Sequence, residues 1–123
     1  MHDRICEILL ENSIQFLYVT NRMVEKTARR IAGDNPFFHC ESSINEKNAF
    51  ELALTCSWAS KKAACLISSE GLYEALDPLM SSAYTGVAGG FVIVAVQEND
   101  TEVTPIGLFS KMPLLVTETT EEF

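Results

Sequence analysis

Residues 42–80 read SSINEKNAFELALTCSWASKKAACLISSEGLYEALDPLM, and this stretch decides the fold class. It begins with a helix pattern that runs to about Ser60. A continuous apolar run follows at Ala63–Ile67, and then a second helix pattern at Leu72–Ala83, which Pro78 is expected to kink or restart. A strand that is apolar at every position is typical of a parallel sheet covered on both faces. The stretch therefore predicts a helix–strand–helix unit of an α/β protein.

The same alternation extends to both sides of this unit. The expected helices are residues 3–12 and Arg22–Ala32 (ended by Gly33), with one helical turn at Ile106–Ser110; the expected strands are Phe16–Val19, Phe37–Cys40, Phe91–Val96 and Leu114–Thr117. This order predicts a three-layer αβα fold with a mostly parallel sheet. Ligands of such folds bind at the carboxyl ends of the strands. Candidate site residues are thus those that follow strands: residues 20–21, 41–46, the turn expected at 68–71, and 97–100.

Length and charge limit the classes of function. The 123 residues are expected to form one domain, residues 1–123, and the net charge is −8. Eight of the nine Lys and Arg precede Ala63, whereas nine acids follow it, so nucleic acid is not an expected partner. No apolar run is long enough for a membrane span, and no secretory segment is expected near the N-terminus. The expected location is cytoplasmic.

The cysteines and the glycines do not predict a metal or phosphate site. Cys6, Cys40, Cys56 and Cys65 form no C-x-x-C pair, so they are interpreted as small core residues, and a zinc or iron–sulfur site within this chain is not expected. The glycines of TGVAGG (85–90) precede a strand rather than a helix, which favours a tight connection over a phosphate-binding loop. Arg29 and Arg30 are interpreted as part of a solvated helix face.

Glu46 has two interpretations. Ser43 followed by Glu46, just before an apolar run, is the capping-box pattern, in which the two side chains satisfy free backbone N–H groups at a helix start. The alternative is that Glu46 moves a proton on a bound cofactor. Both roles place Glu46 in the first turn of the helix, and the residues alone favour the cap.

Two blocks of sequence carry a family resemblance. NEKNAFELALTCSWASKKA (45–63) followed by DPLMSSAYTGVAGGFVIVAV (77–96), with PLLV at 113–116, resembles the pyrimidine-binding (Pyr) module of thiamine diphosphate-dependent 2-oxoacid:ferredoxin oxidoreductases. The closest branch resembles the alpha subunit of indolepyruvate ferredoxin oxidoreductase. The resemblance implies a thiamine diphosphate-binding fold of the Pyr type, which here is short at its C-terminal end.

The resemblance also implies a site and its partners. A glutamate at the start of this helix bonds the N1′ atom of the aminopyrimidine in that superfamily, and Glu46 is the matching residue; Thr20, Ser69 and Gly71 are the further cofactor-binding residues that the match suggests. Thiamine diphosphate would be shared with a diphosphate-binding (PP) module, and magnesium and iron–sulfur clusters would lie only on partner chains or domains. A 2-oxo acid would be the substrate, a homo-oligomer is possible, and the chain alone is not expected to be active.

Departures from the family pattern leave other functions open. The loops after the first, third and fourth strands differ from the family's, with TNRM at 20–23, Ser69-Glu70 before Gly71, and QENDTEVTPIGL at 97–108. One alternative is therefore a degenerate, non-catalytic assembly or regulatory relative with the same fold. Another is half of a thiamine-dependent decarboxylase, which would use Glu46 in the same way but pass no electrons.

Overall fold

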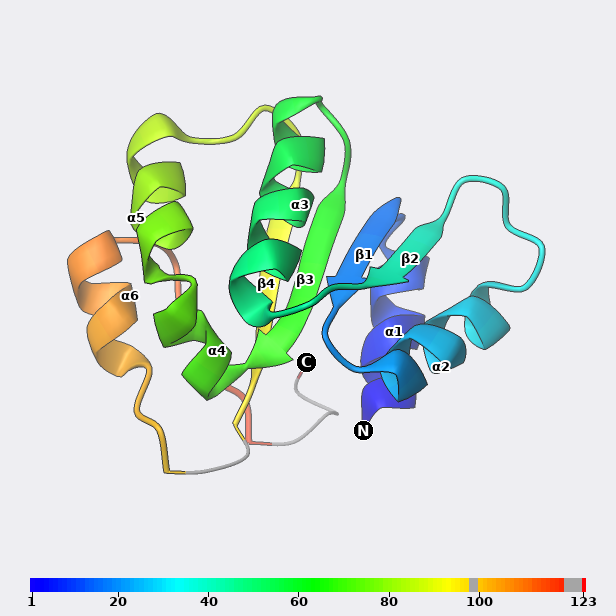
Figure 1. Cartoon of the computed structure of the whole chain (residues 1–123), viewed down its shortest axis with the longest axis horizontal. Helices are drawn as coiled ribbons and strands as arrows, with labels where there is room; N and C mark the ends of the chain where they lie inside the picture. Colours follow the sequence, from blue (N-terminus) through cyan, green and yellow to red (C-terminus); the bar gives the residue numbers. More distant parts are fainter. Residues whose placement is uncertain (98–99, 119–122) are drawn as a thin grey trace.

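The computed structural model describes residues 1–97, 100–118 and 123, and it contains a four-stranded, all-parallel sheet between two layers of helices (Figure 1). The strands are β1 (Phe16–Val19), β2 (His39–Ser42), β3 (Ala63–Ser68) and β4 (Phe91–Val96), and their order across the sheet is β2-β1-β3-β4. The helices are α1 (His2–Glu11), α2 (Arg22–Ala32), α3 (Glu46–Trp58), α4 (Ser69–Glu74), α5 (Leu76–Thr85) and α6 (Thr104–Ser110). The predicted three-layer α/β fold is confirmed.

Alternate residues of the strands build two cores, one on each face. Leu17 and Val19 face α1 and α2, whereas Tyr18 between them faces α3. The first core also contains Ile5, Cys6, Leu9, Val24, Ala28, Cys40, Ala64, Leu66 and Val94. The second contains Ala49, Phe50, Ala53, Leu54, Cys65, Ile67, Leu72, Leu79 and Ile106. Because β3 contributes to both cores, its first five residues are all buried, as the apolar run predicted.

Helix α3 is apolar on more than one side because it has two sets of intramolecular neighbours. It packs on β1 and β3 with one side and against α4 and α5 with another. Its C-terminal end also holds the glycine connection before β4: Gly89 N–H donates to Ser57 O over 2.8 Å, and Trp58 Nε1 donates to Gly86 O over 3.0 Å. The connection is thus tight, as predicted, and α3 is covered largely by its own chain.

Four local predictions are wrong. The second strand is His39–Ser42, not Phe37–Cys40, because its position is set by pairing with β1 rather than by the apolar pair at its start. Residues 69–71 are not a turn but the beginning of α4, which Ser68 caps by accepting from Gly71 N–H. The helix expected at Leu72–Ala83 is interrupted, as predicted, but the break lies at Ala75 between α4 and α5 rather than at Pro78, which lies inside α5.

The fourth wrong prediction is the last strand. Leu114–Thr117 forms no strand, and β4 has no second partner among the described residues. Leu114 instead packs against α6. A Cβ atom placed on Gly107 of that helix would lie only 3.0 Å from Leu114 Cβ. The candidate site residues 97–100 include residues 98 and 99, which lie outside the described residues. Among those that are described, no helix has the length and apolar character that crossing a membrane requires.

Candidate functional site

The carboxyl ends of β1, β2 and β3 meet at one edge of the sheet, and α3 begins there. Asn45 is the N-cap of α3, with extended backbone and a side-chain oxygen that accepts from Asn48 N–H over 2.8 Å. Glu46 is therefore the first residue of the helix. The predicted cap at Ser43 is wrong, because the chain at Ser43 still follows the sheet: Ser43 N–H donates to Val19 O over 2.7 Å.

Glu46 is bonded to the end of β3. The Ser68 hydroxyl donates to Glu46 Oε1 over 3.4 Å and accepts from Gly71 N–H over 2.9 Å. One hydroxyl thus connects the first turn of α3 with the first turn of α4. Since Glu46 is half-buried, this bond fixes the direction of a carboxylate that lies at the strand ends without being sealed from solvent.

The Glu46 side chain packs directly against the backbone of α4 at Gly71. A Cβ atom at position 71 would lie 2.0 Å from Glu46 Cγ and 2.6 Å from Glu46 Cβ, far inside van der Waals contact. Only a residue without a side chain allows α4 to approach α3 this closely. The match of Gly71 to the family pattern therefore has a physical reason in this structure, which is room for the Glu46 side chain.

Ser43 adds a polar atom near this site that has no partner. Its Oγ atom is buried, and no hydrogen bond to it is found among the residues that the structure describes. A buried hydroxyl without a partner costs free energy, so such atoms are uncommon and suggest a missing ligand or water. Ser43 lies beside the end of β1, three residues before Glu46, on the same edge of the sheet.

The other predicted site residues lie at the same edge but are not all in contact. Ser69 is 2% exposed and is the first residue of α4, next to the hydroxyl that bonds Glu46. Thr20 directly follows β1 and is half-buried, and within the described residues it forms no hydrogen bond with Glu46. The structure thus brings Glu46, Gly71 and the residues at the start of α4 together, with Thr20 at the end of the neighbouring strand.

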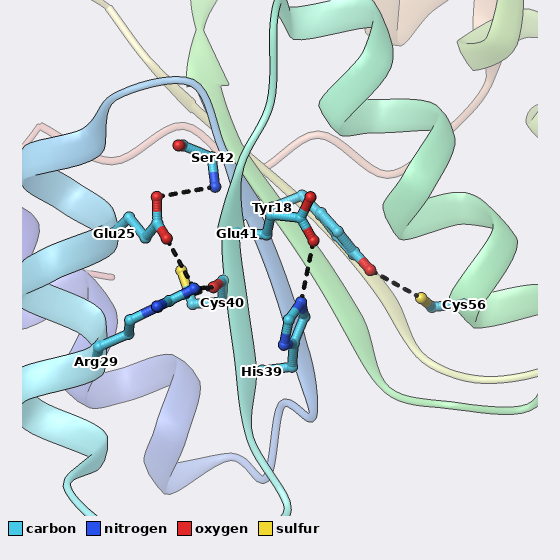
Figure 2. Close-up of polar contacts among 8 residues, drawn as sticks. All are labelled: Tyr18, Glu25, Arg29, His39, Cys40, Glu41, Ser42 and Cys56. Carbon is cyan, nitrogen blue, oxygen red and sulfur yellow. Dashed lines mark hydrogen bonds and ion pairs between the residues drawn. The ribbon is translucent and has the colours of Figure 1, made fainter.

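A second polar cluster lies on the outer side of β2, and the sequence did not point to it (Figure 2). Glu25 and Arg29, both from α2, form an ion pair of 2.8 Å. Glu25 accepts from Ser42 N–H, and Arg29 donates to Cys40 O. Their spacing of four residues is a sequence signal for an ion pair on a helix, but not for contacts with a strand. Arg29 does lie on a solvated face of α2, with 59% of its side chain exposed, but it also bonds the β2 backbone.

A groove of about 340 Å³ accompanies this cluster; it is lined by Arg22, Glu25, Lys26, Arg29, Glu41 and Ser42. The hydrogen bond from Ser42 and the nearby Arg29 lower the pKa of the Glu25 carboxyl, so it stays ionised.

Two further polar contacts lie on the opposite face of the sheet. His39 and Glu41 form an exposed pair at 3.1 Å on the α3 side of β2, and the Tyr18 hydroxyl lies 3.6 Å from Cys56 Sγ.

Three of the four cysteines are buried in the two cores of this fold. All four are free thiols, and Cys6, Cys40 and Cys65 are buried. Burial raises the pKa of Cys65 to about 12, and burial together with nearby Glu25 raises that of Cys40 to about 12. Within the described part of the chain, no three His, Cys, Asp or Glu side chains gather as a metal site would require.

Comparisons with known proteins point to one family. The indolepyruvate oxidoreductase subunit IorA of Pyrococcus abyssi is 35% identical over 91 residues, which cover 68% of this chain and 14% of that protein. The subunit of the same name from Archaeoglobus fulgidus is 36% identical over 92 residues (69% and 15%), and that from Thermococcus kodakarensis is 34% identical over 84 residues (63% and 13%).

No protein-family model matches the chain, and no solved structure matches it. The chain spans about 14% of the length of the curated relatives that it matches. Because two of these relatives are 35% and 36% identical over 68% and 69% of the chain, the chain belongs to the family of the indolepyruvate oxidoreductase subunit IorA and matches one segment of that subunit.

Proposed function

We propose that residues 1–123 form a single Pyr-like domain that serves a thiamine diphosphate-dependent 2-oxoacid:ferredoxin oxidoreductase of the indolepyruvate type. In this proposal the domain holds the aminopyrimidine end of the cofactor, and a partner module holds the diphosphate. The observation that carries the proposal is the position of Glu46, a half-buried carboxylate in the first turn of α3, at the strand ends where α/β folds bind ligands. The printed names of the relatives support the oxidoreductase class.

The residues at this edge fit the pyrimidine part of such a cofactor. Glu46 Oε1 accepts from Ser68, whereas Oε2 has no hydrogen-bond partner among the described residues, so one oxygen is available to a ring nitrogen. The space beside Gly71 is filled by the Glu46 side chain itself, and the buried Ser43 hydroxyl has no hydrogen-bond partner in the described part of the chain. A polar ring that forms one hydrogen bond with the Ser43 hydroxyl, in addition to its bond with Glu46, would give that hydroxyl a partner.

Glu46 would hold a proton at the N1′ atom of the aminopyrimidine. A carboxylic acid suits this role because it both donates and accepts the proton, whereas Gln cannot ionise. When bound, the cofactor supplies a carbon nucleophile for the 2-oxo acid. Ser68 would keep the carboxyl group in place through its bond to Oε1, and Gly71 would keep α4 close enough for that bond. Thr20 and Ser69 would line the same edge.

The rest of the active site would come from partners. The proposal assigns magnesium, the diphosphate contacts and the iron–sulfur clusters to a PP module and to electron-carrying chains or domains. It also includes a cytoplasmic location, which the four unpaired thiols support because reduced cysteines are typical of that compartment. A 2-oxo acid such as indolepyruvate is the proposed substrate class.

One observation favours a non-catalytic relative as the second candidate. Glu46 already has a partner within its own chain, since the Ser68 hydroxyl donates to it, and this contact would stabilise the junction of α3 and α4 without any cofactor. In that case the fold would serve assembly or regulation.

The composition of the native assembly separates these candidates. We would purify this chain from its own cells without denaturation and determine its partners, thiamine and iron by mass spectrometry. A PP-type partner with thiamine diphosphate and iron–sulfur clusters is the expected result. Thiamine without iron would indicate a decarboxylase instead, and an assembly with neither thiamine nor a PP-type partner would contradict the proposal.

A further inference from the structure

Strand β2 is an edge strand of the sheet, and its residues point their backbone N–H and C=O groups alternately toward β1 and away from it. His39 N–H donates to Gln15 O, and Ser43 N–H donates to Val19 O, so residues 39, 41 and 43 face β1. In a parallel pair, the residues between them point their N–H and C=O groups away from the partner strand. Cys40 and Ser42 therefore present four backbone groups at the outer edge, where another strand could pair.

Two of these four groups are occupied by side chains of α2. Arg29 donates to Cys40 O from Nε over 3.2 Å and from Nη2 over 2.9 Å. Glu25 Oε2 accepts from Ser42 N–H over 3.2 Å. Figure 2 shows both side chains reaching from α2 to consecutive outward positions of the strand.

The two side chains also hold one another. Arg29 Nη2 lies 2.8 Å from Glu25 Oε1, so the pair spans from one backbone group to the next as a single unit. Although Arg29 is more than half exposed, Glu25 is only 18% exposed and stays ionised because Ser42 and Arg29 lower its pKa. Charge-assisted hydrogen bonds of this kind are about twice as strong as neutral ones.

We propose that Glu25 and Arg29 form a clasp that closes the β2 edge against pairing with a second copy of this chain. A second copy is the partner that fits, because two β2 edges related by a twofold axis offer the same donors and acceptors to each other. An incoming strand would need Cys40 O and Ser42 N–H, which the clasp occupies. Opening the clasp would free both and permit a continuous sheet across two chains.

The test compares two double variants, each of which removes one acidic and one basic side chain and so leaves the net charge unchanged. Glu25→Ala/Arg29→Ala removes the clasp, whereas Arg4→Ala/Glu7→Ala removes the exposed 3.3 Å pair of α1, which does not touch β2. Amide hydrogen exchange of Cys40 and Ser42, measured by NMR, reports on the β2 edge itself, and sedimentation velocity reports on association. Each protein is measured from micromolar to millimolar concentration.

For the clasp variant at low concentration, exchange at Ser42 should rise by about tenfold or more, the effect of losing one net hydrogen bond. At high concentration it should dimerise, and the Cys40 and Ser42 amides should become protected together. The wild type and the α1 variant should show neither change. An Arg29→Lys variant, which keeps the charge but loses the two-nitrogen contact, should shift in the same direction by less.

Three results would overturn the clasp. The first is unchanged exchange at Ser42 in both clasp variants, and the second is a double variant that stays monomeric at millimolar concentration. The third is dimerisation of the α1 control to the same extent as of the clasp variants. If the double variant does not fold, the Arg29→Lys comparison decides, since it preserves the helix and the net charge. Failure of the clasp would leave the Glu46 proposal unaffected, because the two sites share no residue.

Discussion

Replacing Gly71 by alanine tests whether α4 must approach Glu46 as closely as the structure shows. The new Cβ atom would lie 2.0 Å from Glu46 Cγ, 2.6 Å from Glu46 Cβ and 2.8 Å from Glu46 Cδ. Ordinary carbon contacts are about 3.5 Å or longer, so the nearest pair must separate by about 1.5 Å. Because Glu46 Cβ is fixed to the α3 backbone, rotating the end of the side chain cannot remove the collision.

The magnitude follows from two opposing effects. Overpacking of this kind typically costs about 1–3 kcal/mol of folding free energy. Gly71 lies inside α4 and does not have a positive φ angle, so alanine itself suits the backbone there and contributes about 0.5–1 kcal/mol in the opposite direction. We expect Gly71→Ala to lower the free energy of unfolding by up to about 2 kcal/mol in the wild-type background.

The same substitution should behave differently where Glu46 is absent. In a Glu46→Gly background the three colliding atoms are gone, and Gly71→Ala should be neutral or stabilising by up to about 1 kcal/mol. A Glu46→Ala background is the matched control, because it keeps the Cβ contact at 2.6 Å and should retain much of the strain. Urea unfolding followed by circular dichroism measures all six proteins. The close packing would be refuted if Gly71→Ala had the same effect in all three backgrounds, since coupling between touching residues must appear as non-additivity.

The remaining predictions concern the cap and the thiols. Asn45→Ala should cost about 1 kcal/mol of unfolding free energy because it removes the α3 cap, whereas Ser43→Ala should cost less than about 0.5 kcal/mol because its buried hydroxyl has no partner to lose; the reverse order would restore Ser43 as the cap. The pKa of Cys65 is raised from 9.0 to about 12, so the unfolded thiol ionises first and stability should fall between pH 9 and 12, by at most about 1.4 kcal/mol per pH unit for this group. Cys65→Ala should flatten that part of the stability profile, and an unchanged slope would contradict the burial of the thiol.

The sequence was most informative where burial alone determines structure. The strand at Phe16–Val19 matches its predicted bounds because its last three residues are buried between two helix layers. Phe91–Val96 matches as well because its residues are all apolar, although only Val94 is buried in this edge strand. The other edge strand, β2, was misplaced, since HCES at 39–42 is largely polar and its position depends on pairing with β1. Composition does not show such pairing, and the apolar residues Phe37 and Phe38 favour a strand that begins two residues too early.

The site was predictable only in part for a similar reason. Ser43 and Asn45 both suit an N-cap, and only the backbone distinguishes them, because Ser43 still pairs with β1. The contact of Glu46 with Gly71 depends on how closely two helices approach, a distance that no local pattern contains. The clasp on β2 was missed because its partners are main-chain groups, which leave no signature in the sequence.

The most direct test of the account is turnover by the native assembly carrying Glu46→Gln. The substitution preserves the shape of the side chain and its ability to accept from Ser68 over 3.4 Å, but removes its ability to carry a proton. We would measure 2-oxo acid-dependent reduction of an electron acceptor, together with the thiamine content and subunit composition of the same preparations. If Glu46 carries the proton, the assembly and its thiamine should be retained while most of the turnover is lost. Turnover equal to the wild type would contradict it and leave Glu46 with a structural role at the junction of α3 and α4.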